Sequence, residues 1–504
     1  MDANGSSEAL TTVERELKLA AGPGFHLPDL AGLKPGVEAR PGDTRRMETT
    51  YYDTSDLRLA RWGCNLRHRS REGWTVKLPG NGSNGSMLER SEIEFRGTAK
   101  TPPQAALKLV RAYLRNTALQ PIAHLSTLRH RVVLADEDGR QLAEVVDDEV
   151  SVLDRRRVAA RFREVEVELA EGADDGLLTA VRKRLLAAGA SPADQTPKLV
   201  RAVGSKAAAP AEVVASPLPR RPTAGQLVTR ALSAAVAQLL ANDPRVRLGS
   251  DLEAIHDARV AARTLRSHLR TFGRLLKGEP RHTDSLRTLG HELGEVRDRE
   301  VMLELLRSQS EKLSEPDRKV VGELLKRLEG EIHASEEGLA KFMDSAGYVE
   351  LLDSLVELAN APKFNKLAEL PASQAAVELA RRPWRQLRKA VHALPDSPEA
   401  PELHRVRILA KRTRYAAEAI TPIVGKRAER FAEAAEALQT VLGDYHDAIV
   451  AEEWLRSAGA TGRRAYTAGK LGAIVLARAD SMRARWPAAW KSLNRKRLRE
   501  WFNT

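Results

Sequence analysis

The spacing of apolar residues divides the chain into two parts. From residue 10 to about residue 203, apolar and polar positions mostly alternate, which is typical of half-buried strands. Two stretches within this part have helical spacing instead. The pattern predicts strands at 13–19, 64–70, 73–79, 88–95, 127–134, 141–150 and 162–169, and helices at 102–115 and 174–188. We therefore expect an α+β or barrel domain over residues 10–203.

The second part of the chain has a different composition and period. Residues 204–222 are rich in Ala, Pro and Ser and show no apolar period, so we expect a linker there. From residue 223 to residue 504, long amphipathic segments with few β-branched runs indicate an all-α domain. Prolines punctuate these segments at Pro316, Pro362, Pro371, Pro383 and Pro395.

An internal duplication runs through the helical part. The segment 255–270 (IHDARVAARTLRSHLR) aligns with 403–418 (LHRVRILAKRTRYAAE), and 293–301 (LGEVRDREV) aligns with 442–450 (LGDYHDAIV). The offsets are 148 and 149 residues. Two motifs that keep nearly the same separation rarely arise by chance. We expect two similar bundles of about four helices each, over about 223–370 and 371–504, related by a pseudo-twofold axis.

Charge and composition narrow the classes of function. The 504 residues carry a net charge of +13, and the basic excess lies beyond residue 200, since acidic and basic side chains nearly balance before it. This distribution indicates an anionic partner such as nucleic acid, a membrane surface or polyphosphate. The single cysteine, Cys64, cannot form an internal disulfide. Because the sequence shows neither a signal peptide nor about 18 consecutive apolar residues, we expect a soluble cytoplasmic protein.

Two of the predicted strands carry rows of carboxylates. In VERELKL the side chains of Glu14, Glu16 and Lys18 share one face, because side chains alternate along a strand. In FREVEVEL the same arrangement repeats with Glu164, Glu166 and Glu168. Carboxylates at i and i+2 lie about 7 Å apart and raise one another's pKa when they are enclosed without a cation. Oxygen ligands without His or Cys favour Mg²⁺ or Mn²⁺.

A solvated strand face is the simpler explanation of any one such strand, but basic residues weaken it here. Cations stand at strand spacing on several other predicted strands, namely Arg67, Arg69, Lys77, Arg90, Arg129 and Arg131, and Glu92 and Glu94 accompany Arg90. A closed antiparallel barrel can place all these charges inside and turn its apolar face outward against helices. Its interior would hold acids that need metal and bases that need anions, as a metal–phosphate site does.

The ordered set of motifs resembles the CYTH superfamily, the triphosphate tunnel metalloenzymes. The strand V-E-R-E-L-K is similar to the family's E-x-E-x-K signature. The resemblance extends over residues 10–203 through YYDT (51–54), LRHR (66–69), Lys77, RSEIE (90–94), EVEVE (164–168) and PKLVRA (197–202). Family members include triphosphatases, thiamine triphosphatases and class IV adenylyl cyclases. The ending departs from the family's S-K-Y-x-R-A pattern, because Pro197 and Leu199 flank Lys198.

The resemblance implies a role for each charged residue. The metal would be held by Glu14, Glu16, Glu164, Glu166 and Glu168, with Asp147 as a further candidate. Triphosphate oxygens would contact Lys18, Arg67, Arg69, Lys77, Arg90, Arg129, Arg131, Lys198 and Arg201. Glu14, Glu16 and Lys18 would be the catalytic residues. The reaction implied is attack of a metal-oriented water on a terminal phosphorus, with Mg²⁺ or Mn²⁺ as cofactor.

The duplicated helical motif carries a repeated basic stripe. Its members fall within an arc of about 80° on a helix, and they are His256, Arg259, Arg263 and Arg266 in the first copy and His404, Arg407, Lys411 and Arg414 in the second. Arg270 extends the first stripe, whereas its counterpart Glu418 does not extend the second. An ion-paired surface would ordinarily explain such a face. Stacked like charges are destabilising, however, and a bound polyanion would relieve them.

This second pattern resembles a CHAD domain over residues 223–504. The resemblance implies a helical domain that binds inorganic polyphosphate. Asp298 and Asp447, in the second repeated motif, could orient the stripe or simply form ordinary ion pairs. The histidines lack the spacing and the Cys partners of a zinc site. Aromatic residues form only 4% of the chain and no nucleic-acid module is recognisable, so no specific nucleic acid partner and no membrane partner are expected.

Three interpretations of function follow from the residues and the resemblances. In the first, the tunnel hydrolyses tripolyphosphate or the ends of polyphosphate while the helical domain retains the substrate. In the second, the protein binds polyphosphate without turnover. In the third, the tunnel acts on an organic triphosphate, as a thiamine triphosphatase or an adenylyl cyclase does. The expected partner is inorganic polyphosphate or tripolyphosphate, and association with polyphosphate granules and the oligomeric state are left open.

Overall fold

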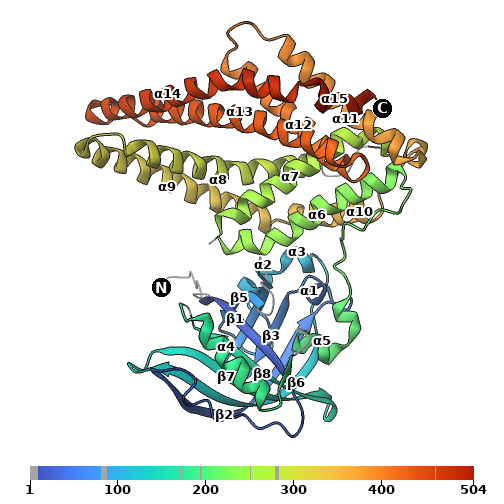
Figure 1. The fold of residues 1–504 in the computed structure, drawn as a ribbon, viewed down its shortest axis with the longest axis vertical. Helices are drawn as coiled ribbons and strands as arrows, with labels where there is room; N and C mark the ends of the chain where they lie inside the picture. The colour runs from blue at the N-terminus through green and yellow to red at the C-terminus, as the bar shows by residue number, and fades with distance from the viewer. Residues whose placement is uncertain are drawn as a thin grey trace. The chain divides into compact units, whose positions relative to one another are not determined.

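The chain forms two compact units, Met1–Glu212 and Val213–Thr504. The structure, a computed structural model, describes residues 10–80, 88–170, 172–192, 196–249, 251–278, 283–459 and 461–503. The first unit is built on an antiparallel sheet and the second is helical (Figure 1). No helix in these ranges is long and apolar enough to cross a membrane.

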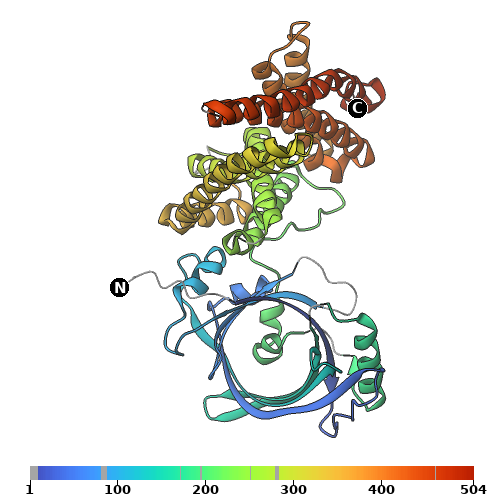
Figure 2. The same ribbon diagram turned by 90° about the vertical axis from the view of Figure 1, so that its left-hand side faces the viewer.

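The first unit contains a nine-stranded sheet in the order β5-β4-β3-β2-β6-β7-β8-β1-β9. The strand β1 pairs with β8 and β9 and also with β5, and Figure 2 shows the strands arranged as a ring. The strands are β1 (Leu10–Ala21), β2 (Val37–Asp53), β3 (Asn65–Arg69), β4 (Gly73–Pro79), β5 (Leu88–Phe95), β6 (Gln120–Asp136), β7 (Gln141–Asp154), β8 (Arg157–Leu169) and β9 (Ser191–Pro192).

Alternation along the strands separates charged from apolar side chains. On β8, Val165 and Val167 are buried on the face opposite Glu164 and Glu166. The apolar face packs with neighbouring strands against α4 (Asp175–Ala187), where Val181 is buried in the same cluster. Asp174 caps this helix by accepting a hydrogen bond from the backbone of Gly176. The sheet therefore buries its apolar side under a helix and turns its charged side the other way.

The long strand β2 is absent from the sequence prediction. Its ladder with β6 is irregular between Pro41 and Thr44, and this bulge breaks the alternation that identifies a strand. The predicted helix 102–115 is divided into two short helices, α2 (Gln104–Leu109) and α3 (Arg111–Leu114). The other short helical elements of this unit are α1 (Arg58–Arg61), α5 (Lys198–Val203) and the 3₁₀ turn Ser205–Ala208.

The second unit consists of long helices joined by short loops, as the amphipathic pattern predicts (Figure 1). Pro383 differs from the expected helix breaks, because it lies inside α11. The helices are α6 (Ala224–Leu248), α7 (Leu252–Phe272), α8 (Thr283–Ser310), α9 (Glu315–Asp344), α10 (Ala346–Asn360), α11 (Ala372–His392), α12 (Ala400–Val424), α13 (Lys426–Ala458), α14 (Gly462–Leu493) and α15 (Lys496–Arg499).

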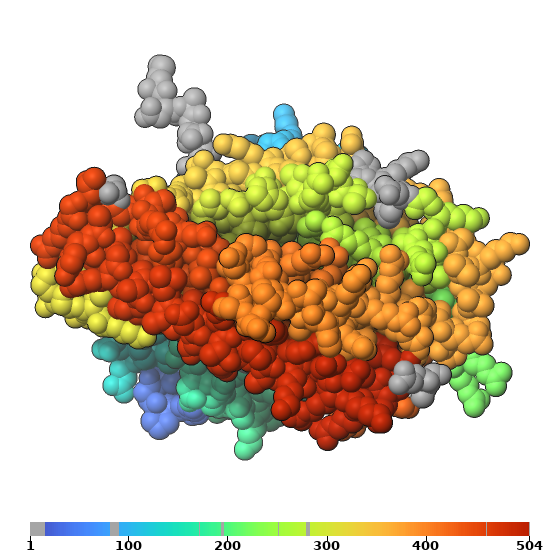
Figure 3. Space-filling view, turned by 90° about the horizontal axis from the view of Figure 1, so that it is seen from above, coloured from blue at the N-terminus to red at the C-terminus, as the bar shows by residue number. Residues whose placement is uncertain are grey.

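Equivalent helices of the two repeats meet within the second unit. The helix α7 packs against α12, and α8 packs against α13. At the starts of α6 and α11, Ala224 N donates to Leu370 O and Ala372 N donates to Pro222 O, both at 2.8 Å. These two bonds are equivalent under the 148-residue offset of the duplicated motif. Figure 3 shows the two halves side by side, the first in green to yellow and the second in orange to red.

Candidate tunnel site and basic helical surface

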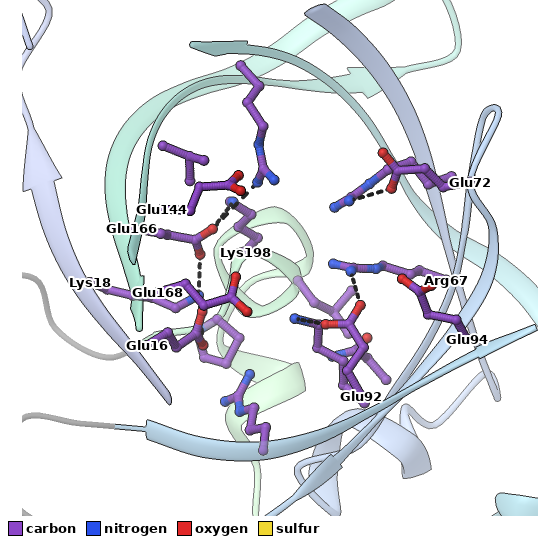
Figure 4. Close-up of a pocket in the computed structure, with 18 of the residues that line it drawn as sticks. Glu16, Lys18, Arg67, Glu72, Glu92, Glu94, Glu144, Glu166, Glu168 and Lys198 are labelled. Atoms are coloured by element: carbon purple, nitrogen blue, oxygen red, sulfur yellow. Dashed lines mark hydrogen bonds and ion pairs between the residues drawn. The ribbon is translucent and has the colours of Figure 1, made fainter. Parts of the chain in front are cut away.

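A cavity of about 440 Å³ lies among the strands of the first unit. Its lining combines nine basic and seven acidic side chains with a few others, so that the charges nearly balance. The close-up in Figure 4 shows these side chains pointing toward one another. The charged lining residues are Glu16, Lys18, Arg45, Arg67, Arg69, Glu72, Lys77, Arg90, Glu92, Glu94, Arg129, Arg131, Glu144, Glu166, Glu168 and Lys198.

Three carboxylates form a row across one wall of the cavity. Glu16 on β1 stands directly opposite Glu168 on β8, and Glu168 stands opposite Glu144 on β7. Burial raises the pKa of Glu168, and the charges of Glu144, Glu92 and Glu16 raise it further. The Oε1 atom of Glu16 is buried and accepts no hydrogen bond, and Lys18 Nζ lies 3.5 Å from it. We call Glu16, Glu168 and Glu144 the carboxylate row.

Two lysines bind the acids beside this row. Lys18 Nζ donates to Glu166 Oε1 at 2.6 Å, and Lys198 Nζ, from α5, donates to the same carboxylate at 3.1 Å. Although burial opposes it, these lysines hold the pKa of Glu166 well below its usual range. Lys198 also donates to Asp148 at 2.6 Å and lies 3.1 Å from Glu164. The first turn of α5 thus supplies a cation to three strand carboxylates.

Arginines and a lysine make paired contacts around the rest of the cavity. Arg67 and Lys77 each lie 2.6 Å from Glu92. Arg131 binds Glu144 with two nitrogens, at 2.8 and 2.7 Å. Arg69 lies 2.7 Å from Glu72, and Arg129 binds Asp148 through two bonds of 2.8 and 2.6 Å. A guanidinium held by a carboxylate in this way is oriented for bidentate binding of phosphate as well.

Most of the predicted tunnel residues line this cavity. They are Glu16, Lys18, Arg67, Arg69, Lys77, Arg90, Arg129, Arg131, Glu166, Glu168 and Lys198. Glu164 lies behind them, buried against Lys198. Arg201 is outside the lining, 3.7 Å from Glu164, with its guanidinium over the ring of Phe162. The side chain of Glu14 lies outside the described residues, although its backbone pairs with that of Arg90.

Asp147 is placed differently from the sequence expectation. It lies on the outward face of β7 and binds Arg163 with two bonds of 2.8 and 2.7 Å. Its neighbour Asp148 points to the cavity side, because it stands opposite Glu164 in the ladder. The sequence VVDDEV contains both acids, and only the pairing of β7 with β8 places Asp148 in phase with Glu164.

Other lining residues had weaker signals in the sequence. Glu144 follows the same alternation as Asp148, four residues earlier on β7. Arg45 and Tyr51 lie on β2, which the irregular pattern concealed. Glu72 lies in the turn between β3 and β4, and Asn65 begins β3. Glu92 and Glu94 stand at the strand spacing already noted beside Arg90.

The carboxylate row fits a hard dication by donor type. All of its donor atoms are oxygens and its carboxylates repel one another, although Lys18 Nζ lies 3.5 Å from Glu16 Oε1. In the positions that the described side chains take, no group of three or more His, Cys, Asp or Glu residues is arranged to hold a metal ion. A cation here would be held by Glu16 and Glu168 first, because Arg131 already binds Glu144.

The basic stripes of the helical unit lie on α7 and α12, the two helices that pack together. Arg263 Nε donates to the hydroxyl oxygen of Tyr415 on the opposite helix, at 2.7 Å. Arg259 binds Asp298 with two bonds of 2.7 and 2.8 Å. Its counterpart Arg407 lies 3.6 Å from Asp447. The acids of the second repeated motif therefore contact the stripe arginines.

Lys411 lies in the middle of the paired stripes. Burial lowers the pKa of this lysine to about 7, and the charges of Arg407, Arg263 and Arg259 contribute to the shift. Asp447 opposes the shift but does not cancel it. A buried cation surrounded by three others lacks negative charge, and a bound anion would supply it.

The environment of the stripe histidines favours their neutral form. Burial lowers the pKa of His256 and of His404. The ring of His404 lies 4.3 Å from that of His446, centroid to centroid, and burial together with Arg407 lowers the pKa of His446 to about 4. Neutral imidazoles can donate hydrogen bonds to phosphate oxygens without adding to the crowded positive charge.

Comparison with known proteins assigns both units to families. Residues 12–199 match the CYTH domain and residues 230–456 match the CHAD domain. Over 501 residues the chain is 31% identical to Uncharacterized protein Rv2226 of Mycobacterium tuberculosis H37Rv, covering 93% of this chain and 94% of that protein. The chain belongs to the family of CYTH–CHAD proteins. Uncharacterized protein MT2285 of the CDC 1551 / Oshkosh strain is similar to the same extent, with 31% identity and the same coverage.

Two solved structures resemble parts of this CYTH–CHAD protein. PptA from Streptomyces chartreusis is 24% identical, with a TM-score of 0.44, over 54% of this chain and 99% of that one. The CHAD domain from the plant Ricinus communis is 26% identical, with a TM-score of 0.48, over 56% of this chain and 96% of that one. The predicted order, a CYTH domain followed by a CHAD domain, is confirmed by the family matches.

Proposed function

We propose that the CYTH domain hydrolyses inorganic tripolyphosphate, or the end of a polyphosphate chain, with Mg²⁺ or Mn²⁺ as cofactor. The observation that carries this proposal is the cavity of about 440 Å³, in which the carboxylate row faces a set of arginines and lysines. The volume lies in the range of small-molecule sites, which is roughly 300–1,000 Å³. The pairing of β1 with both β5 and β8 supports a closed barrel around this space.

In the proposed reaction, the carboxylates bind the metal and the basic side chains bind phosphate oxygens. A dication held by Glu16 and Glu168 would neutralise phosphate oxygens and favour ionisation of the attacking water. Arg67, Lys77 and Arg129 would bind the remaining phosphate oxygens and stabilise the charge that spreads over the transferring group. In the free protein these basic side chains bind Glu92 and Asp148. An entering phosphate would replace some of those contacts with its own oxygens.

The lining favours an inorganic substrate over an organic triphosphate. Among the described lining residues the only aromatic one is Tyr51, and it is 4% exposed. A nucleobase or a thiamine ring usually needs an apolar or aromatic surface for binding. The charged wall offers little of either, so thiamine triphosphate and ATP should be poorer substrates than tripolyphosphate.

Phosphate release from tripolyphosphate, thiamine triphosphate, ATP and long-chain polyphosphate tests this proposal. With Mg²⁺ or Mn²⁺ we expect the fastest release from tripolyphosphate, lost in Glu16→Gln. Glu149→Gln is the matched control, since Glu149 is about half exposed on the outward face of β7. No release at any metal concentration would contradict catalysis and favour a purely binding role. Faster release from thiamine triphosphate would contradict the choice of an inorganic substrate.

We further propose that the CHAD domain binds polyphosphate through the paired stripes of α7 and α12. The support is the crowding of cations around Lys411, where burial and the charges of three arginines lower the pKa of the lysine to about 7. An extended polyanion would relieve this repulsion along both helices. Binding of the full-length protein to long-chain polyphosphate, compared with duplex DNA at matched salt, tests the idea.

The expected result is tighter binding to polyphosphate than to DNA, weakened at least about tenfold in the double variant Arg263→Ala, Lys411→Ala. Arg478→Ala, Arg497→Ala removes the same charge from two exposed positions elsewhere in the helical unit. Equal affinity for polyphosphate and DNA would show that the surface binds anions without specificity for polyphosphate. Equal losses in the two double variants would contradict the position of the site.

A further inference from the structure

The two repeats of the CHAD domain differ in charge around one pair of equivalent arginines. In the second repeat, Arg414 donates to Glu418 at 2.6 Å and lies 2.7 Å from Glu436 on α13. Although burial opposes it, these two acids raise the pKa of Arg414. This end of the stripe is therefore neutralised by residues of the protein itself.

In the first repeat the same positions are all basic. Arg266 matches Arg414, and the residues that match the two glutamates are Arg270 and Arg287. Burial lowers the pKa of Arg266, and the charges of Arg270 and Arg287 lower it further. In the described part of the chain no acid lies within ion-pair distance of Arg266 or Arg270. Arg287 has only the exposed Asp284, at 3.2 Å, as a partner.

A fourth arginine reaches this group from the other repeat. Arg412 on α12 lies outside the predicted stripe, and its match in the first repeat is Thr264. Burial lowers its pKa, and Arg270 and Arg266 lower it further. The Nε atom of Arg412 is buried without a hydrogen-bond partner. We call Arg266, Arg270, Arg287 and Arg412 the one-sided cluster.

The one-sided cluster lies next to the centre of the basic surface, which is the group of cations around Lys411. Arg263, which contributes to the crowding at Lys411, precedes Arg266 by one helical turn on α7. From Arg263 to Arg270 the helix rises by about 10 Å. Along α12, in contrast, a phosphate chain would come close to Glu418, where like charges repel.

We propose that bound polyphosphate leaves the centre of the CHAD surface over the first repeat only, along the one-sided cluster. This proposal rests on polyphosphate binding by the CHAD domain and gives that binding a direction. The pseudo-twofold arrangement of the helices would by itself allow two equivalent paths. Arg270 and Arg287 stand in the first repeat where the second repeat has Glu418 and Glu436. The path over the first repeat therefore attracts phosphate, and the path over the second repels it.

Reciprocal charge reversal in the full-length protein tests the direction. Arg270→Glu, Arg287→Glu gives the first repeat the acids of the second, and we expect its affinity for long-chain polyphosphate to fall at least about tenfold. Glu418→Arg, Glu436→Arg gives the second repeat the cations of the first, and its affinity should rise about threefold or more. Titrations without divalent metal, at several salt concentrations, keep hydrolysis out of the measurement.

Matched controls separate position from net charge. Arg478→Glu, Arg497→Glu makes the same change in net charge at exposed positions of α14 and α15 and should weaken binding less than about threefold. Arg412→Ala should weaken binding about fivefold, and Arg405→Ala, at an exposed position of α12 outside the stripe, should weaken it less than twofold. Circular dichroism and phosphate release from tripolyphosphate check that each variant is folded.

The outcomes test the one-sided path separately from polyphosphate binding by the CHAD domain. If the wild-type protein does not bind polyphosphate, polyphosphate binding by the CHAD domain is wrong. If it binds but the two reversal variants and the exposed control behave alike, only the one-sided path is wrong. An equal loss from Arg412→Ala and Arg405→Ala would also overturn the one-sided path.

Discussion

The cavity of the CYTH domain and the basic surface of the CHAD domain present opposite electrostatic problems. In the cavity, acids and bases nearly balance, and the pKa of Glu168 in the carboxylate row is raised by burial and by neighbouring carboxylates, although Lys77 opposes the shift. On the helices, positive charges are crowded and the pKa of Lys411 falls to about 7. A cation would therefore stabilise the carboxylate row, and an anion would stabilise the helical surface. The cavity should therefore bind phosphate together with a dication, and the helical surface should bind phosphate alone.

Removal of divalent metal should separate the two sites most strongly. With a chelator, phosphate release from tripolyphosphate should fall to background, a loss of at least about 100-fold, because the carboxylate row can no longer approach phosphate. Binding of long-chain polyphosphate by the same protein should change less than about twofold. Phosphate release and fluorescence titration check this. Recovery of release on adding Mg²⁺ or Mn²⁺ is the control, and loss of binding with the chelator would contradict the distinction.

Within the CYTH domain, two adjacent aspartates should differ greatly. Asp148→Asn removes the charge that Arg129 and Lys198 bind, and activity on tripolyphosphate should fall about 100-fold. Asp147→Asn disturbs only the buried pair with Arg163 on the other face of β7, so it should lower the melting temperature but reduce activity less than about threefold. Steady-state kinetics on each variant, with melting curves to verify folding, provide the comparison. Equal losses of activity in the two variants would contradict the idea that the face of β7 on which an aspartate lies determines its role.

The affinity of the CHAD domain for polyphosphate should fall as the pH rises above about 7. Lys411 is flanked by Arg407, Arg263 and Arg259, with Asp447 as the opposing acid, and its pKa is about 7 in the free protein. A bound polyanion raises that pKa, so between the two values the complex holds more protons than the free protein. Affinity then decreases by up to about tenfold per pH unit.

The variant Lys411→Arg isolates this effect from titration of the ligand. Arginine stays charged through the whole range, so the variant should bind with a flatter pH profile. Affinity measured from pH 6 to pH 9 at fixed ionic strength gives the two slopes. Identical slopes for wild type and Lys411→Arg would assign the pH dependence to the polyphosphate or to the histidines.

The smallest effect concerns the contact across the two repeats. Tyr415→Phe removes the hydroxyl that accepts the hydrogen bond from Arg263 but keeps the ring over its guanidinium. A hydrogen bond of about 1 kcal/mol corresponds to roughly fivefold in affinity, and we expect polyphosphate binding to weaken by about threefold to fivefold. Isothermal titration measures it. Tyr445→Phe on α13 is the control, and a similar loss there would indicate general destabilisation.

The order of motifs was enough to predict the two domains, because each motif depends on local periodicity. Alternation placed Glu166 and Glu168 on one face of β8, and helical spacing placed Arg259 and Arg263 on one face of α7. Alternation fails where the backbone is irregular. The bulge after Pro41 hid β2 and with it the lining residues that β2 supplies.

Adjacent acids were a second source of error. In VVDDEV either aspartate could face inward, and only the ladder with β8 fixes which one does. The same limit holds for the helices, where the sequence placed Arg414 and Arg266 at matching positions. Whether each is neutralised depends partly on α13 and α8, which approach from elsewhere in the chain.

Which side chains share a face follows from the sequence alone, because the backbone period of a strand or helix is local and nearly invariant. The tertiary structure decided which faces meet. Glu16 and Glu168 are far apart in sequence and become neighbours only through the pairing of β1 with β8. The pKa of Lys411 falls because the side chain is buried in the folded unit, and because Arg407 on the same helix and Arg263 and Arg259 on α7 lie close to it. Electrostatic energy depends on distance and burial, and both are properties of the folded chain.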